Sequence, residues 1–509
     1  MRYRRPLLAI AAVLALWSCS TPEWTDADIV ALDAVGLQAE LAAGRVSAVR
    51  VTQAYLRRIA ELDDAGPRLG AVIEINPDAE SIAGGLDDRL RSGATLGPLH
   101  GVPVLVKANI DTADAMATTA GSLALAEHRA QADADIVARL RAAGAVLLGK
   151  TNLSEWANFR SIKSTSGWSS VGGQTRNPYV LERNPCGSSS GAAVAVAARL
   201  APLAVGTETD GSIVCPAATN GVVGIKPTIG TVSRRGIVPI AHSQDTAGPL
   251  ARTVAGAALL LAVLADSGVA AETRGRETVA GLRVGVVRDF HGAGQDPDVE
   301  AGFSQALAWL AANGVVLVDP VQTELPPTIG EAELTILLAE FRDDLNAYLG
   351  GVQRGARSLD ELIAFNAARA PEVMPHFGQE LLLAARDGGG AADASYSAAT
   401  RTAADARSAV ARLFAELRLD ALVAPTNSRA WRTNYAAGDR SGGVYSANIA
   451  AVTGLPNVTV PTVLAKELPL GVSFIGQLGN EPLLLTLAAT IERERGPFPE
   501  PHFLPTTAD

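Results

Sequence analysis

The strongest constraint on this chain is a run of small residues that starts at Cys186. The run reads C-G-S-S-S-G, continues through an alanine-rich segment, and ends in G-T-E-T-D-G-S-I-V-C-P. We expect a serine-rich loop, a short tight helix over residues 192–200 and a second turn. Small side chains leave the backbone N–H groups of such a turn open to an approaching carbonyl group. Each of these donors can contribute about 3 kcal/mol to the stabilisation of an oxyanion.

A serine hydroxyl is a weak nucleophile at neutral pH and needs a proton acceptor within hydrogen-bond reach. Lys107 is the candidate acceptor, because the apolar run before it, V-L-V, predicts a buried strand. Burial disfavours the ammonium form, and a neutral amine can act as a base. Lowering the pKa of a lysine from ~10.4 to ~7–8 requires roughly 4 kcal/mol. A surface position at the end of a strand is the alternative, and it is the commoner place for a lysine taken alone.

These motifs resemble the core of the amidase signature family, whose pattern is a glycine-serine loop, a helix and T-D-T-G-G-S-I, preceded by a lysine in V-K-D-N. In that family a lysine, a serine that follows a cis peptide bond and a nucleophilic serine form the catalytic triad, with the two serines 24 residues apart. Ser188 and Ser212 have this separation. The resemblance implies that Ser212 is the nucleophile, Ser188 the bridging serine after a cis Gly187–Ser188 bond, and Lys107 the base.

The resemblance also implies an oxyanion hole and a substrate class. The hole would be made by the backbone N–H groups of Thr209, Asp210, Gly211 and Ser212. Similar segments run densely through residues 99–265 and return near the C-terminus as V-A-P-T and G-L-P-N-V-T-V-P. The segments W-A-N-F-R, P-C-G-S-S-S-G and T-E-T-D-G-S-I-V-C-P resemble the peptide amidase branch most. This branch implies hydrolysis of the C-terminal amide of peptides to the free acid and ammonia, through an acyl-enzyme.

The chain departs from the family pattern at two positions. Ala108 replaces the aspartate that usually follows the lysine, so Lys107 loses any hydrogen bonds from that carboxylate. Asp210 replaces the first glycine of G-G-S and places a carboxylate beside the nucleophile. Asp210 is therefore a candidate for substrate binding, and capping of a turn is its alternative role. The aromatic residues Trp156, Phe159 and Trp168 are further candidates for substrate binding, with ordinary core packing as the alternative.

Other functions remain open at this stage. Within the family, the chain could hydrolyse small or fatty acid amides, or act as the A-type subunit of a glutamyl-tRNA amidotransferase. The residues G-S-S-S-G also fit G-x-S-x-G, the nucleophile elbow of α/β-hydrolases, with Ser189 as the nucleophile. That interpretation needs a later histidine and leaves T-E-T-D-G-S-I unexplained. The candidate histidines stand in unremarkable contexts; they are His242, His291, His376 and His502.

Composition and spacing argue against several partners. The net charge of -10 argues against a nucleic acid partner. The sequence contains neither Cys-x-x-Cys nor His-x-x-x-His spacing and no phosphate-binding glycine loop, so we expect no metal and no cofactor. The expected partner is a small-molecule or peptide amide substrate, and no obligate protein partner is predicted.

The first 19 residues have the pattern of an export signal. Three arginines precede the apolar run over residues 7–17, which is too short to span a bilayer. The run L-W-S-C resembles a lipobox, so Cys19 is a candidate for lipidation. We expect an exported protein of the cell envelope or periplasm, tethered to the membrane through Cys19 or otherwise secreted. In that oxidising compartment Cys186 and Cys215 could form a disulfide, although buried free thiols are the commoner arrangement and are expected here.

The fold class implied by the resemblance is a single α/β domain over residues 26–505. Its centre would be a mixed, twisted β-sheet covered by helices on both faces. Helical spacing of apolar residues predicts a helix over residues 47–63, with Ser47 as its N-cap. A variable helical region over about residues 268–419, interrupted by three glycines at 388–390, would cover the sheet and shape the substrate channel.

Overall fold

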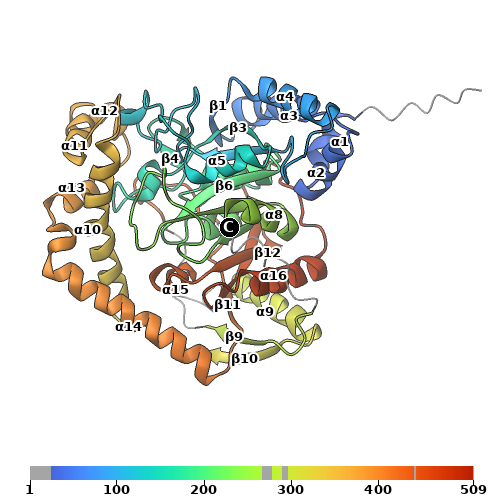
Figure 1. The fold of residues 1–509 in the computed structure, drawn as a ribbon. Helices are drawn as coiled ribbons and strands as arrows, with labels where there is room; N and C mark the ends of the chain where they lie inside the picture. The colour runs from blue at the N-terminus through green and yellow to red at the C-terminus, as the bar shows by residue number, and fades with distance from the viewer. Residues whose placement is uncertain (1–23, 266–277, 289–295, 441–442, 508–509) are drawn as a thin grey trace, which may run out of the picture.

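The computed structural model describes residues 24–265, 278–288, 296–440 and 443–507. The predicted export signal, Cys19 and His291 lie outside these residues, as does the start of the variable region. One sheet of eleven strands runs through the molecule and joins sequence from both ends of the described chain (Figure 1). Because parallel and antiparallel neighbours both occur in it, the predicted mixed sheet is confirmed.

The strands that position the candidate site come from the N-terminal half of the chain. Strand β2 (Pro103–Lys107) is parallel to β3 and to β6 (Leu203–Glu208), with Val106 opposite Val205. Parallel strands end at the same edge of a sheet. Lys107, at the end of β2, therefore lies beside the turn that follows β6, although 100 residues separate the two in the sequence.

The remaining strands complete the sheet. The spatial order of the whole sheet is β1 (Val72–Ile75), β3 (Val146–Thr151), β2, β6, β8 (Thr246–Ala251), β7 (Val223–Lys226), β12 (Asn457–Ala465), β13 (Leu468–Gly476), β11 (Ala421–Pro425), β9 (Arg283–Val287) and β10 (Val316–Val321). Strands β4 (Trp168–Ser169) and β5 (Gly173–Gln174) form a separate small hairpin.

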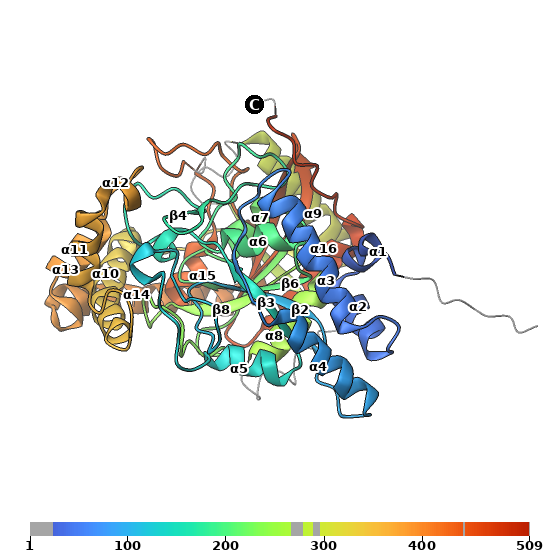
Figure 2. The ribbon, with the colours of Figure 1, turned by 90° about the horizontal axis from the view of Figure 1, so that it is seen from above.

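Helices cover both faces of the sheet, as predicted. Figure 2 shows α6 (Ser190–Ala197) and α7 (Val214–Thr219) on one side of the central strands, and α5 (Asp135–Ala142) and α8 (Val254–Leu264) on the other. All eight residues of α6 are buried, which only small side chains permit so close to the sheet. This helix begins two residues earlier and ends three residues earlier than the sequence predicted.

The other helices lie around this core. Helix α3 spans Ala48–Ile59, and the Ser47 hydroxyl accepts a hydrogen bond from the Arg50 N–H at 3.1 Å, which confirms the predicted N-cap. The described residues also include α1 (Asp26–Ala31), α2 (Ala34–Ala42), α4 (Ala79–Arg91), α9 (Pro297–Ala312), α15 (Ala447–Thr453) and α16 (Glu481–Arg495). No helix in the described ranges combines the length and the apolar character needed to cross a bilayer.

The predicted helical region over about residues 268–419 is helical only in part, because β9 and β10 within it are strands of the central sheet. Residues 329–416 form a helical layer of their own along one side of the molecule (Figure 1). Its helices are α10 (Ile329–Leu349), α11 (Leu359–Ala368), α12 (Ala370–Val373), α13 (Glu380–Asp387) and α14 (Ala394–Glu416). The expected break is present, because α13 ends just before the three glycines. A separate hydrophobic cluster joins this layer to the loops after β3, where Phe159 packs against Phe341 with ring centroids 5.0 Å apart.

A buried ion pair also attaches the helical layer to the loops after β3. Arg160 Nη1 donates to Oε1 of Glu155 at 2.9 Å, and both side chains are fully buried. The same guanidinium donates to the carbonyl oxygens of Val373 and Phe377, at 2.8 and 3.1 Å. Its Nε also donates to the Gly378 carbonyl oxygen at 3.1 Å. Because one arginine satisfies four separate acceptors, its removal leaves a buried carboxylate and three carbonyls without these partners.

We expect Arg160→Met to lower the free energy of unfolding by about 3–5 kcal/mol, because an unpaired buried charge is strongly destabilising. Equilibrium unfolding in urea measures the change. The matched control is Arg354→Met, whose partner Glu127 lies 3.6 Å away with both side chains more than three-quarters exposed. The control substitution should lower the free energy of unfolding by less than about 1 kcal/mol. Equal losses of unfolding free energy in the two variants would contradict a stabilising role for the buried ion pair of Arg160.

Candidate active site

Lys107 lies at the end of β2 and is fully buried. Its Nζ atom donates to Ser188 Oγ at 2.7 Å, to Thr207 Oγ1 at 2.8 Å and to the Thr207 carbonyl oxygen at 3.3 Å. Asn109 Nδ2 donates to the same Thr207 hydroxyl at 3.0 Å. The amine is thus oriented by Ser188 and Thr207, without the carboxylate that Ala108 replaces. The alternative interpretation of Lys107 as a surface residue is wrong.

The environment of Lys107 favours its neutral form. Burial lowers the pKa of the amine to about 7, although the negative charges of Asp245 and Glu208 oppose part of this effect. Both carboxyl groups are themselves buried, and burial raises the pKa of each, that of Asp245 to about 6. A large fraction of Lys107 is therefore neutral at neutral pH, which a general base requires.

The two serines lie on segments that are bonded to each other. The Gly187–Ser188 peptide bond is cis, as the resemblance implied. The N–H of Ser189 donates to the carbonyl oxygen of Ser212 at 3.1 Å, and the N–H of Ser154 donates to that of Ser188 at 3.1 Å. Ser188 is fully buried, whereas Ser212 is 8% exposed and lines a cleft. Of the two, Ser212 is therefore the one that a substrate can reach.

The turn after β6 presents backbone donors toward the cleft. Among the described residues, no hydrogen bond has the backbone N–H of Asp210, Gly211 or Ser212 as its donor. Gly211 has φ +72, and a Cβ built on it would lie 2.0 Å from the Tyr445 hydroxyl, so only glycine fits. The N–H of Thr209, the fourth predicted donor, likewise donates in no hydrogen bond of the described residues. These donors can accommodate an oxyanion at the turn that the resemblance implied.

Two buried carboxylates accept hydrogen bonds from residues at the two ends of the turn. Glu208 Oε2 accepts hydrogen bonds from the N–H groups of Ile213 and Val214, at 2.7 and 2.9 Å. The Thr209 hydroxyl donates to Oδ1 of Asp245 at 2.6 Å. Glu208 thus caps the turn, which was one alternative for Asp210. The Asp210 carboxylate instead accepts a hydrogen bond from the Tyr445 hydroxyl at 2.9 Å.

The cleft at Ser212 has a volume of about 270 Å³. It is lined by Ala157, Asn158, Phe159, Ser166, Cys186, Gly187, Thr209, Asp210, Ser212, Cys215, Ile240, Leu337, Trp431, Asp439 and Tyr445. Of the four predicted substrate-binding residues, Asp210 and Phe159 line this cleft.

The other two predicted substrate-binding residues, both tryptophans, do not line the cleft. Trp156 is 2% exposed within the cluster that joins the helical layer. Trp168 packs edge-on against His376 and Phe377, at 5.4 and 5.1 Å between ring centroids. Packing against a layer distant in the sequence covers both rings, as in the alternative interpretation of ordinary core packing.

Residues that the sequence analysis did not single out complete the site. Thr207 and Asn109 lie in the quoted motifs, two residues before Thr209 and two after Lys107. Because alternate residues of a strand share one face, this spacing could have identified them. No local signal marks Tyr445, which comes from a segment more than 200 residues beyond the turn.

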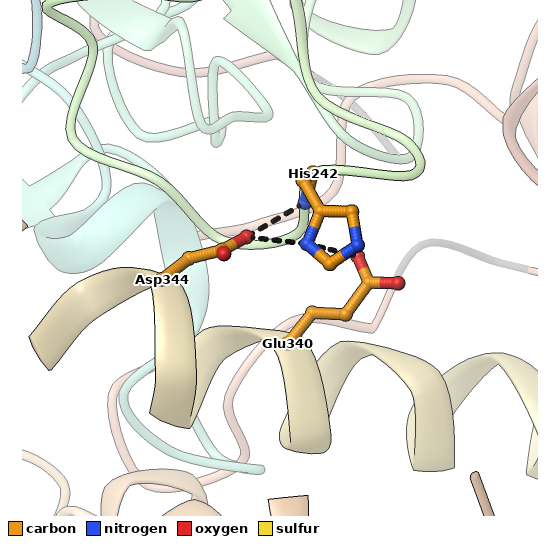
Figure 3. Close-up of side chains that lie close together, drawn as sticks. All are labelled: His242, Glu340 and Asp344. Carbon is orange, nitrogen blue, oxygen red and sulfur yellow. Dashed lines mark hydrogen bonds and ion pairs between the residues drawn. The ribbon is translucent and has the colours of Figure 1, made fainter. Parts of the chain in front are cut away.

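A loop packed against helix α10 brings together His242, Glu340 and Asp344 (Figure 3). His242 Nδ1 lies 2.9 Å from Asp344 Oδ2 and 3.4 Å from Glu340 Oε2. The same carboxylate oxygens accept the backbone N–H groups of His242 and Ser243, each at 2.9 Å. The sequence spacing did not predict this group. In the structure its bonds attach the loop before β8 to α10.

The environment of Ser189 does not suit a nucleophile. Its hydroxyl donates to the carbonyl oxygen of Thr207 at 3.0 Å and accepts from the Thr207 N–H at 3.2 Å. Of the histidines that an elbow would need, His242 is bonded to Asp344, and His376 stacks on Tyr435 with ring centroids 3.8 Å apart. The bonds of Ser189 are structural, and they position β6 against the serine loop.

Cys186 and Cys215 form a disulfide, with their Cα atoms 6.0 Å apart. The expectation of free thiols is therefore wrong. The bond joins the residue two before Ser188 to the residue three after Ser212. Sequence could not show it, because the loop before α6 and the first turn of α7 meet only when both helices pack on the sheet.

We expect the double variant Cys186→Ala/Cys215→Ala to lose about 3–4 kcal/mol of unfolding free energy, because the bond closes a long loop of the unfolded chain. Urea unfolding with and without a strong reductant measures this. The reductant should shift the midpoint of the wild-type protein and leave that of the double variant unchanged. Equal shifts in both proteins would show that the bond does not contribute.

Comparison with known proteins identifies the family. The Amidase family model matches residues 50–485. A probable amidase from Arabidopsis thaliana is 37% identical over 475 residues, which cover 88% of this chain and 87% of the plant protein. The A-type subunit of the glutamyl-tRNA(Gln) amidotransferase from Salinispora tropica is 36% identical over 506 residues, which cover 93% of this chain and 99% of that protein.

Solved structures agree with this assignment. The native peptide amidase of Stenotrophomonas maltophilia superposes with a TM-score of 0.87 at 47% identity, covering 92% of this chain and 98% of that chain. A peptide amidase in complex with the competitive inhibitor chymostatin superposes with a TM-score of 0.86 at 47% identity, covering 92% and 99%. From the family match and the shared fold, this chain belongs to the amidase signature family and is an amide-hydrolysing enzyme.

Proposed function

We propose that this enzyme hydrolyses the C-terminal amide of peptides to the free acid and ammonia. Lys107, Ser188 and Ser212 act as base, proton relay and nucleophile. The observation that carries the proposal is the buried hydrogen bond of 2.7 Å between Lys107 Nζ and Ser188 Oγ. A buried amine with a pKa near 7 beside a serine is suited to proton transfer and otherwise costs stability.

In the first half of the reaction, neutral Lys107 takes the proton of the Ser188 hydroxyl while Ser188 Oγ takes that of Ser212. The Ser212 oxygen attacks the amide carbonyl carbon, and the carbonyl oxygen becomes an oxyanion that accepts hydrogen bonds from the N–H groups of residues 210–212. The ammonium of Lys107 then returns a proton through Ser188 to the leaving nitrogen. Ammonia departs, and an ester on Ser212 remains.

In the second half, water attacks the Ser212 ester. Its proton passes through Ser188 to Lys107, and the same three N–H groups stabilise the second oxyanion. The carbon–Oγ bond then breaks, Ser212 regains its proton through the relay, and the peptide acid leaves. No step requires a group that this chain does not supply.

The cleft supports a peptide rather than a fatty substrate. Its lining includes the polar side chains of Asn158, Ser166 and Asp439 together with the rings of Phe159 and Trp431. A fatty acyl chain is better matched by a lining of apolar side chains alone. The similarity to solved peptide amidases at 47% identity supports the same substrate class.

An amidotransferase A-type subunit is the second candidate, because the Salinispora tropica protein is similar to 93% of this chain. The predicted export signal favours the peptide amidase, since charging of tRNA is cytoplasmic. We propose that the enzyme acts in the cell envelope, tethered through lipidated Cys19 or secreted, without an obligate protein partner. Globomycin-sensitive processing at Cys19 in cells would test the tether.

The pH dependence of kcat/KM should report Lys107. Since only the neutral amine is active, kcat/KM should rise as the pH rises through about 7. Below that value it should fall about tenfold per pH unit. Lys107→Met should lower kcat/KM by about 10²–10⁴-fold, whereas the control Lys466→Met, an exposed lysine, should match the wild type. An acid limb that persists in Lys107→Met would contradict the assignment of the base.

Ammonia release from C-terminally amidated dipeptides tests the substrate class. We expect release from these peptides, and its loss in Ser212→Ala and in Ser188→Ala, because each variant breaks the relay. Activity confined to simple aliphatic, aryl or fatty amides would place the enzyme in the second class of hydrolases. Activity on glutamine that requires the other amidotransferase components would support the A-type subunit instead. Activity retained in Ser212→Ala and lost in Ser189→Ala would restore the nucleophile elbow.

A further inference from the structure

A pair of carboxyl groups lies beside the turn after β6, residues 209–212, which we call the oxyanion turn. The pair takes no part in the proton relay. Asp210 belongs to the turn, and Glu333 comes from the start of helix α10. Asn448 Nδ2 bridges them, because it lies 2.7 Å from Glu333 Oε2 and 3.3 Å from Asp210 Oδ2. Because one amide nitrogen bonds an oxygen of each residue, the two carboxyl groups lie side by side. Two buried carboxyl groups placed side by side favour a state in which one of them keeps its proton.

The other direct partners of the pair are neutral donors. The Tyr445 hydroxyl donates to Asp210 Oδ1 at 2.9 Å, and Gln244 Nε2 donates to Glu333 Oε1 at 2.8 Å. These partners come from the loop before β8 and from the segment that leads into α15, and Glu333 itself belongs to helix α10. The pair is therefore the point at which these elements meet behind the turn.

Charged groups on the neighbouring strands do not neutralise the pair. Glu208 on β6 repels an ionised Asp210, and Lys226 on β7 attracts it. Lys226 Nζ, however, donates to the carbonyl oxygens of Leu455 and Pro227, at 2.8 and 3.2 Å. Without a cation in contact, two buried carboxyl groups this close do not both ionise near neutral pH.

We propose that Asp210 and Glu333 share a single proton and act as positioning residues that hold the oxyanion turn against helix α10. The inference rests on the proposed function, because it gives the pair a role in aligning the backbone donors next to Ser212. When the shared proton is lost, the two carboxylates repel each other. The turn then moves away from α10, and the donors of residues 210–212 lose their alignment with the oxyanion.

The pair therefore sets the alkaline side of the pH profile. Burial and the adjacent charge of Asp210 raise the pKa of Glu333 to about 8. The shared proton is present below this pH and is lost as the pH rises through it. Lys107 must be neutral and the pair must be protonated, so we expect a bell-shaped kcat profile. Its acid limb belongs to Lys107, and its alkaline limb belongs to Asp210 and Glu333.

Three variants distinguish the effect of the shared proton from the effect of side-chain packing at Asp210 and Glu333. Asp210→Asn keeps an acceptor for Tyr445 and donates from its amide to an ionised Glu333, so its alkaline limb should disappear. Glu333→Gln should restore most of the activity at pH 7, within about threefold of wild type, since it loses only the bond from Asn448. Glu333→Ala should lower kcat by about 10–100-fold with KM little changed, as expected when oxyanion donors are misaligned. The matched control is Glu331→Gln, an exposed residue of the same helix.

Infrared difference spectroscopy in D₂O gives a readout that does not depend on activity. The spectrum of the wild type minus that of Asp210→Asn should contain the C=O stretch of a protonated carboxylic acid at neutral pD. The band should vanish above pD 9, and it should be absent from the difference between the wild type and Glu331→Gln. Absence of the band at neutral pD would overturn the shared proton. A band together with an unchanged alkaline limb in Asp210→Asn would overturn the positioning role.

The two readouts also separate this inference from the proposed function. If the enzyme releases no ammonia from peptide amides, the substrate assignment fails while the infrared band still decides whether the proton is shared. The kinetic test then uses whichever amide the enzyme does hydrolyse, because the oxyanion forms on any amide carbonyl. If peptide amides are hydrolysed and the band is absent, the substrate assignment stands and the inference fails.

Discussion

The active site depends on the burial of one amine. An ammonium at the position of Lys107 would be cut off from water, so the fold favours the neutral base and the pKa falls to about 7. The sheet supplies this environment, because β2 is an interior strand that is hydrogen-bonded to β3 on one side and to β6 on the other. Ser188 and Thr207 then provide the hydrogen-bond partners that orient the amine. In the proposed mechanism, activation of the nucleophile therefore begins with the position of a strand.

The remaining parts of the site are held by contacts between segments that are distant in the sequence. The serine loop and the oxyanion turn are joined by a backbone hydrogen bond on one side and by the disulfide between Cys186 and Cys215 on the other. Helix α10 is linked to the same turn through Asn448, which donates to both Glu333 and Asp210. The loop before β8 is linked to the turn through Gln244, whose Nε2 donates to the Thr209 carbonyl oxygen at 3.5 Å. Rigid support of this kind keeps backbone donors aligned before the oxyanion forms, which is the main source of their effect.

Local sequence patterns predicted the elements well where one strong signal acted alone. The N-cap at Ser47, the buried strand that ends at Lys107 and the mainly helical region before β11 are all present. Helix boundaries were less accurate, as at α6, because packing on the sheet decides where such a small-residue helix begins. The aromatic residues were the weakest predictions, since Trp156 and Phe159 are three residues apart and only Phe159 lines the cleft.

The sequence by itself determined the residues on which the proposed chemistry depends: the small residues of the turn, the serines 24 positions apart and a lysine at the end of an apolar run. These signals are local, because each depends on residue type and on short spacing. Only the tertiary structure decided what surrounds them, including the disulfide, the partners of Asp210 and the helical layer that buries the tryptophans. Those contacts join residues tens to hundreds of positions apart. No periodicity encodes them, because they arise only when helices and loops pack on a completed sheet.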